Sequence, residues 1–143
     1  MLSDKYQKLF LKDVDFVVET VDKFLLIEYK NSTIPGAINP DAFENKIRTG
    51  EHYIEIARKY YDTIIYLMSC NKNKKYEYIY ILECKTADSV IRKLVTSKIM
   101  KQLPFDLQKD PDIKHELISS FVVMNIDEWN ISYGNSFPIA KMK

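Results

Sequence analysis

Hydrophobic and polar residues alternate over two neighbouring stretches within residues 13–30. A period of two is typical of a β-strand, because successive side chains point to opposite faces of a sheet. In the second stretch Glu28 and Lys30 follow two large apolar residues on the same face, and in the first stretch Asp15 shares its face with other acids. The pattern predicts an antiparallel β-hairpin.

The turn between the two strands fixes which residues face each other. If residues 21–22 form the tip of a two-residue turn, Asp15 lies opposite Glu28 and Asp13 opposite Lys30, with facing Cβ atoms roughly 5 Å apart. A four-residue loop keeps this register, whereas a three-residue loop breaks it. Two carboxylates side by side repel each other unless a positive group lies between them, so the register predicts a divalent-metal site.

A short helix is expected over residues 2–11, before the hairpin. After the hairpin, the pattern predicts helices and strands in alternation. The expected elements after the hairpin are a loop at 31–38, a helix from 39 to about 68 that Gly50 interrupts, a strand at 76–83, a helix at 88–103, a loop at 105–114, a strand at 119–126 and a helical turn from Asp127. Residues 62–68 are rich in β-branched side chains, which leaves a strand there as an alternative.

This order of elements predicts an α/β (α+β) fold, with a small mixed β-sheet that contains the N-terminal hairpin and is flanked by helices. The 143 residues, of which 46% are hydrophobic, suit one domain with a sizeable core. We expect a single domain over residues 1–143, with its core at about 2–103 and a C-terminal strand and helical turn in 104–143.

The charge and cysteine content of the chain limit its possible partners and its cellular location. The net charge of +1 excludes a globally basic coat for nucleic acid, although a local basic groove stays open. Cys70 and Cys84 are isolated thiols, and no apolar signal segment follows Met1, so a cytoplasmic location is expected. No stretch approaches the roughly 20 apolar residues that span a bilayer, so no membrane contact is expected.

An acid, any residue and a lysine occur in that order four times: Glu28-Tyr29-Lys30, Glu44-Asn45-Lys46, Glu83-Cys84-Lys85 and Asp112-Ile113-Lys114. The tripeptide alone therefore decides nothing. The second copy falls in a predicted helix and the fourth in a polar loop. The third ends a predicted strand, where Asp62 or Glu77 are candidate partners, but a strand-end ion pair is its simpler interpretation. Only the first copy follows an apolar strand beside an acidic one.

Asp15, followed after twelve residues by Glu28-Tyr29-Lys30, resembles the motif of the PD-(D/E)xK nuclease superfamily. In that family a helix, hairpin strands, a helix and a strand place an aspartate on one strand and (D/E)xK on the next. The resemblance covers roughly residues 2–85 and implies a restriction-endonuclease-like core, with the remaining C-terminal part as an addition to it.

The resemblance also implies a function. Asp15, Glu28 and the backbone carbonyl of Tyr29 are expected to bind Mg²⁺ or Mn²⁺, which prefer hard oxygen ligands. Lys30 is expected to orient the attacking water or stabilise the developing charge. The implied protein is an enzyme, a metal-dependent endonuclease that hydrolyses phosphodiester bonds in DNA rather than RNA. A homodimer that cuts both strands fits this implication.

Two alternatives stay open at this point. Many members of the family carry a further acid on the first helix, where this chain offers only Asp4; Asp13 and Glu19 are nearer substitutes. The protein is alternatively a catalytically degenerate nuclease-fold module that binds nucleic acid or a protein partner without cleavage. In the plainest interpretation the acids and Lys30 form an exposed strand face with weak cross-strand pairs. Arg58 and Lys59, on the helix after the motif, are candidates to line a substrate groove together with one or two of the tyrosines at 60–61 and 76–80.

Overall fold

The computed structural model describes residues 12–31, 49–70, 74–83 and 89–136. Four strands form one mixed sheet in the order β1-β2-β3-β4. Their bounds are β1 (Phe16–Glu19), β2 (Lys23–Asn31), β3 (Lys75–Glu83) and β4 (Ser120–Met124). The helices are α3 (Glu51–Ser69), α4 (Ser89–Met100), the short 3₁₀ helix η1 (Leu107–Lys109) and α5 (Ile126–Tyr133). The predicted mixed α/β fold with an antiparallel hairpin is confirmed.

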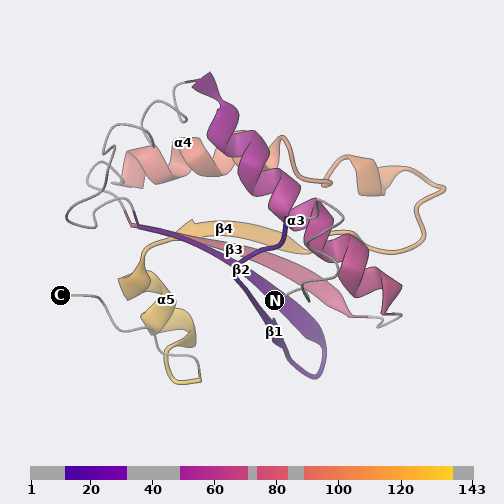
Figure 1. Ribbon diagram of the computed structural model, residues 1–143, viewed down its shortest axis with the longest axis horizontal. Coiled ribbons are helices and arrows are strands. Elements are labelled where there is room, and N and C mark those ends of the chain that lie inside the picture. The colour runs from indigo at the N-terminus through magenta and orange to yellow at the C-terminus, as the bar shows by residue number, and fades with distance from the viewer. Residues whose placement is uncertain (1–11, 32–48, 71–73, 84–88, 137–143) are drawn as a thin grey trace.

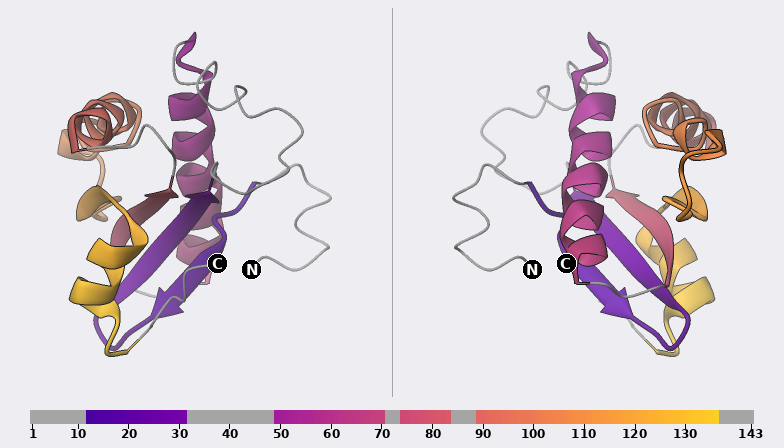
Figure 2. Two further views of the ribbon diagram at one scale, coloured as in Figure 1. Left: turned by 90° about the vertical axis from the view of Figure 1, so that its left-hand side faces the viewer. Right: turned by 90° about the vertical axis from the view of Figure 1, so that its right-hand side faces the viewer.

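Helices cover both faces of the sheet, α3 and α4 one face and α5 the other (Figures 1 and 2). β1 is antiparallel to β2, whereas β2, β3 and β4 run parallel to one another. The parallel pairs are joined by crossovers through α3 and α4. Because such crossovers are almost always right-handed, two that advance in the same direction across a sheet place both helices on one face.

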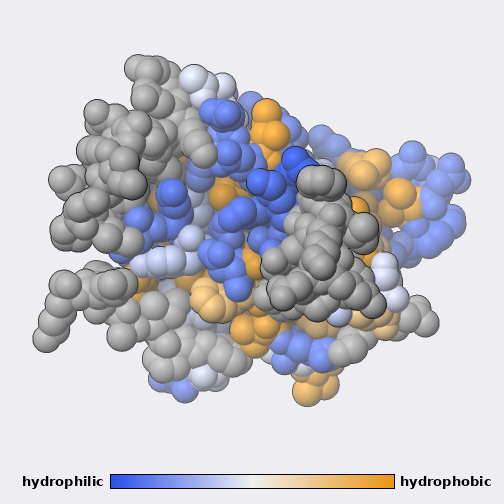
Figure 3. Space-filling view, in the orientation of Figure 1, coloured by the Kyte–Doolittle hydropathy of each residue, from blue (hydrophilic) through white to orange (hydrophobic). Residues whose placement is uncertain are grey.

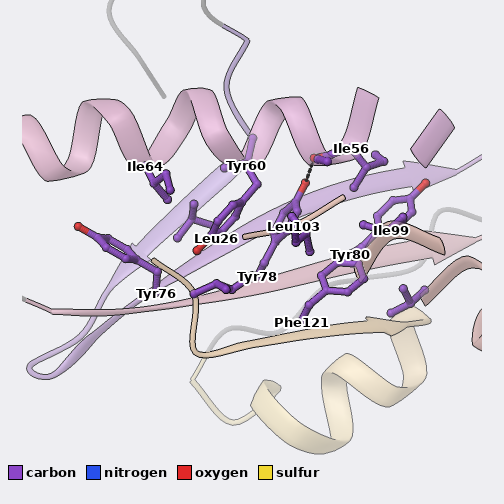
Figure 4. Close-up of a cluster of buried hydrophobic side chains, with 14 of the residues drawn as sticks. Leu26, Ile56, Tyr60, Ile64, Tyr76, Tyr78, Tyr80, Ile99, Leu103 and Phe121 are labelled. Atoms are coloured by element: carbon purple, nitrogen blue, oxygen red, sulfur yellow. Dashed lines mark hydrogen bonds between the residues drawn. The ribbon is translucent and has the colours of Figure 1, made fainter. Parts of the chain in front are cut away.

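The core is divided by the sheet into two clusters. Alternation along β3 points Tyr76, Tyr78 and Tyr80 toward α3 and α4, where all three are buried (Figure 4). The Tyr78 hydroxyl donates to the Ile56 carbonyl of α3 at 2.8 Å, so this buried polar group is satisfied. The intervening residues of β3 pack with Trp129 of α5 on the other face.

The predicted hairpin register is confirmed. Phe16 lies opposite Ile27 and Glu19 opposite Phe24. The backbone N–H of Thr20 donates to the carbonyl of Lys23 at 2.8 Å, which closes the two-residue turn.

The first strand is shorter than predicted, because it begins at Phe16 after a bend at Asp15. The cause is α3. The backbone N–H of Val14 donates to the Thr63 hydroxyl at 3.0 Å, and that of Lys12 donates to the Asp62 carboxylate at 2.8 Å. These bonds draw the chain away from the sheet before β1, as the indigo segment that rises toward α3 in Figure 1 shows.

Residues 62–68 form helix, so the strand alternative for them is wrong. Tyr60, Thr63, Ile64 and Leu67 are buried at the spacing of one helix face, and this packing overrides the low helix propensity of the β-branched residues. Gly50, with φ 83°, immediately precedes α3, where its left-handed backbone suits glycine. The predicted elements at 2–11 and 32–48 lie outside the described residues.

The later elements are confirmed with small shifts. The strand predicted at 76–83 is β3, the helix at 88–103 is α4, the strand at 119–126 is β4, and the helical turn is α5. The C-terminal part completes the core, because Phe121 of β4 and Trp129 of α5 are buried in the two clusters. Among the described residues, no helix is both long and apolar enough to cross a membrane.

Thr63→Val tests the attachment of the segment before β1 to α3. The substitution keeps the side-chain volume but leaves the buried N–H of Val14 without its acceptor, which is expected to cost about 1–3 kcal/mol in the free energy of unfolding. Urea denaturation measures this loss. Thr96→Val is the matched control, because the Thr96 hydroxyl donates to the carbonyl of Arg92 within its own helix, and a change under about 0.5 kcal/mol is expected. Equal losses in the two variants would contradict the prediction.

Candidate functional site

The carboxylates of Asp15 and Glu28 converge at the open end of the hairpin, on the face that α3 covers. The backbone N–H of Asp15 donates to Glu28 Oε1 at 3.2 Å. The backbone N–H of Tyr29 donates to Asp15 Oδ2 at 2.9 Å. Each carboxylate therefore accepts a hydrogen bond from the backbone of the opposite strand, which fixes the orientation of both.

These bonds replace the next rung of the hairpin ladder. In the established register, Val14 and Tyr29 would form the next hydrogen-bonded pair. Instead the N–H of Val14 turns to Thr63, and the N–H of Tyr29 turns to the Asp15 side chain. In an extended strand the N–H and the C=O of one residue point to the same edge. The Tyr29 carbonyl therefore faces the edge at which the Asp15 carboxylate lies.

A third charged group reaches the site from α3, since the Lys59 ammonium forms a close ion pair with Glu28 Oε2. The Glu28 side chain is 5% exposed and that of Lys59 is 31% exposed. The sequence predicts Lys59 only as a residue that lines a substrate groove, not as a partner of Glu28. Helical spacing is the feature of the sequence that points to this contact. Lys59 lies three residues after Ile56 and four before Thr63, both of which are buried, so it lies beside the helix face that packs on the sheet.

Burial dominates the electrostatics of Glu28. It raises the pKa of this carboxyl to about 7, against the hydrogen bond and positive charge of Lys59, which lower it. The charge of Asp15 and a hydrogen bond between the two carboxyl groups raise it further. For Lys59, burial lowers the pKa, but the bond to Glu28 and the charges of Glu28, Asp15 and Glu55 raise it above its ordinary value overall. Lys59 is therefore a cation at neutral pH.

The other predicted site residues are placed as follows. Lys30 is exposed near the end of β2, two residues beyond Glu28 and hence on the same strand face. Glu19 lies at the opposite end of β1 and pairs with Lys74 at 3.4 Å, so it does not join the site. Asp13 precedes the bend, and Asp4 lies outside the described residues.

The donor set suits a small divalent cation. Two carboxylates and the Tyr29 carbonyl are hard oxygen donors of the kind that Mg²⁺ and Mn²⁺ take, usually with several waters. Within the described ranges, no group of three or more His, Cys, Asp or Glu side chains is close enough to hold a metal. A cation here would therefore rest on the Asp15–Glu28 pair, with the Lys59 ammonium as its competitor.

The rival acid cluster is not assembled. Glu83 points to the α5 face, where its carboxylate accepts the N–H of Ile126 at 2.7 Å and caps that helix. The ion pair expected between Glu83 and Lys85 stays a prediction, because Lys85 lies outside the described residues. Glu77 pairs with Lys23 at 3.2 Å, and Asp62 bonds to the segment before β1. Lys85 and the Glu44 copy lie outside the described residues.

Comparison with known proteins adds no relative. No protein-family model matches the chain, and no curated protein or solved structure matches it either.

The raised pKa of Glu28 predicts a stability that falls as the pH rises. The pKa of Glu28 is about 7 in the folded protein, against the ordinary value of 4.5. Between these two pH values the folded state holds a proton that the unfolded state releases. The free energy of unfolding is expected to fall by at most about 3 kcal/mol between these values and to level off above them. Urea unfolding from about pH 5 to about pH 8 measures this slope.

Glu28→Gln should flatten the slope, because it removes the titrating group. Glu77→Gln is the control, since Glu77 lies on β3 in a separate ion pair and should leave the slope unchanged. A Glu28→Gln variant that keeps the wild-type slope would show that another group titrates.

Proposed function

We propose that this protein is a metal-dependent nuclease that hydrolyses phosphodiester bonds in DNA. The observation that supports this most is the convergence of the Asp15 and Glu28 carboxylates at the end of the hairpin, with the Tyr29 carbonyl at the same edge. This arrangement matches the order of groups in the PD-(D/E)xK motif, which the sequence resembles.

Each residue has a defined part in the proposed reaction. Asp15, Glu28 and the Tyr29 carbonyl hold Mg²⁺ or Mn²⁺, which when bound lowers the pKa of a water and neutralises charge on the phosphate. The backbone hydrogen bonds to both carboxylates fix the donors before the substrate arrives, so little reorganisation is needed. Lys30, exposed beyond Glu28, orients the water or stabilises the developing charge.

The surroundings of the site are compatible with a charged substrate. Where Figure 3 leaves α3 uncovered, most of the outward surface of this helix is hydrophilic, although its Ile54 and Ile65 are also exposed. We propose DNA before RNA as the substrate and a cytoplasmic location. A homodimer that cuts both strands stays a prediction.

The second candidate is a nuclease-fold module that binds nucleic acid or a protein partner without cutting it. The Lys59 ion pair favours this candidate, because an ammonium already neutralises Glu28. The lack of a third clustered metal-binding side chain among the described residues points the same way.

Cleavage assays separate the two candidates. End-labelled DNA and RNA, single- and double-stranded, are incubated with Mg²⁺ or Mn²⁺. Asp15→Asn and Glu28→Gln are expected to lower the cleavage rate at least about a hundredfold, because each removes a ligand that also fixes the other. Lys30→Ala is expected to lower it by about tenfold or more.

Glu77→Gln is the matched carboxylate control, expected to cleave at the wild-type rate, and chelation of the metal is expected to stop cleavage. Cleavage that survives Glu28→Gln unchanged would contradict the proposed site. Fluorescence anisotropy measures binding of the same nucleic acids. A wild-type protein that binds nucleic acid but does not cleave it would favour the second candidate.

A further inference from the structure

We propose that Lys59 is the resident counter-cation of the Asp15–Glu28 site, which a divalent cation displaces from Glu28, and that its displaced ammonium then serves the substrate phosphate. This inference deepens the proposed function and rests on it. It assigns to a residue of α3 the positive charge that the motif alone would assign to Lys30.

The bonds of Glu28 identify the group that must leave. One carboxylate oxygen accepts the backbone N–H of Asp15, and the other is paired with the Lys59 ammonium. A metal ion on Glu28 needs one of these oxygens. The Asp15 N–H belongs to the backbone and cannot turn away alone. The Lys59 ammonium lies at the end of a flexible side chain that is 31% exposed, so it is the group that can move into solvent.

The attachment of α3 keeps Lys59 near the site after displacement. The Thr63 hydroxyl accepts the N–H of Val14, the residue before Asp15, and donates to the carbonyl of Lys59 at 2.7 Å. A single side chain therefore connects the helical turn that carries Lys59 to the segment that carries Asp15. The ammonium can swing only about its own stem, which keeps it within a side-chain length of both carboxylates.

If the Lys59 ammonium both competes with the metal and later serves the phosphate, its removal has opposite effects on metal binding and on cleavage. Removal of the ammonium relieves its repulsion of a divalent cation, so the metal should bind more tightly. The same removal deletes a positive charge beside the scissile phosphate, so cleavage should slow. A lysine with only a structural role would not produce these opposite changes.

The experiment compares Lys59→Met with Lys30→Met, a matched loss of one ammonium from the same face. Isothermal titration with Mn²⁺ in the absence of nucleic acid is expected to show roughly tenfold tighter binding for Lys59→Met, and a change within about twofold for Lys30→Met. Cleavage at saturating Mn²⁺ is expected to fall at least about tenfold in Lys59→Met. Lys59→Arg keeps the charge and should bind Mn²⁺ as weakly as the wild type.

A second measurement uses the wild-type chain and so does not depend on how well a variant folds. Acetylation of lysines, measured by mass spectrometry, is expected to modify Lys59 several times faster when Mg²⁺ is added, with Lys98, exposed on α4, as the internal reference. An unchanged or slower reaction of Lys59 would overturn displacement.

The outcomes distinguish this inference from the proposed function. If the wild type cleaves and Lys59→Met changes neither Mn²⁺ affinity nor rate, the inference fails while the nuclease proposal stands. If the wild type neither binds Mn²⁺ nor cleaves but Lys59→Met binds it, the nuclease proposal fails while Lys59 is supported as the competing cation. If neither protein binds Mn²⁺, both proposals are overturned.

Discussion

The packing of α3 across the sheet is the contact on which the rest of the structure depends. The rings of Tyr60 in the helix and Tyr78 in β3 pack at a tilt of 32° with centroids 4.8 Å apart, and the Tyr78 hydroxyl donates to the helix backbone one turn earlier. This contact fixes the rotation of α3 about its axis. Because Lys59 and Thr63 flank the same buried face, the rotation that buries Tyr60 also presents them to the open end of the hairpin.

A buried acid at position 28 is costly for stability. Phe24 and Leu26 precede it on the same strand face and are fully apolar and buried, so an aliphatic side chain would continue that surface without a charge to neutralise. Replacing a buried ion pair by apolar residues of similar volume is often neutral or stabilising. The Glu28–Lys59 pair is thus poorly explained by folding alone, and this supports a role for the carboxylate in binding a cation.

The sequence was sufficient for the parts of the site that depend on local geometry. The register of Asp15 against Glu28 follows from strand alternation and one short turn, and both act over a few residues. The bend at Asp15 was not predictable, because it is produced by a hydrogen bond to Thr63, which lies 49 residues from Val14. Lys59 was missed as a partner for a similar reason, since its contact with Glu28 depends on how a whole helix is rotated on the sheet.

The two candidate functions differ in the free energy of exchanging the Lys59 ammonium for a divalent cation on Glu28. Burial raises the pKa of Glu28, so the charge of this carboxyl changes near neutral pH, and the Lys59 ammonium pairs with it. A nuclease requires that a divalent cation win this competition at cellular concentrations, whereas a binding module results if the ammonium wins. Since the backbone bonds to Asp15 and Glu28 hold the oxygens in place in either case, the geometry of the carboxylates cannot decide between them. The relative affinity of Glu28 for Lys59 and for a metal is therefore the quantity that separates the two proposed functions.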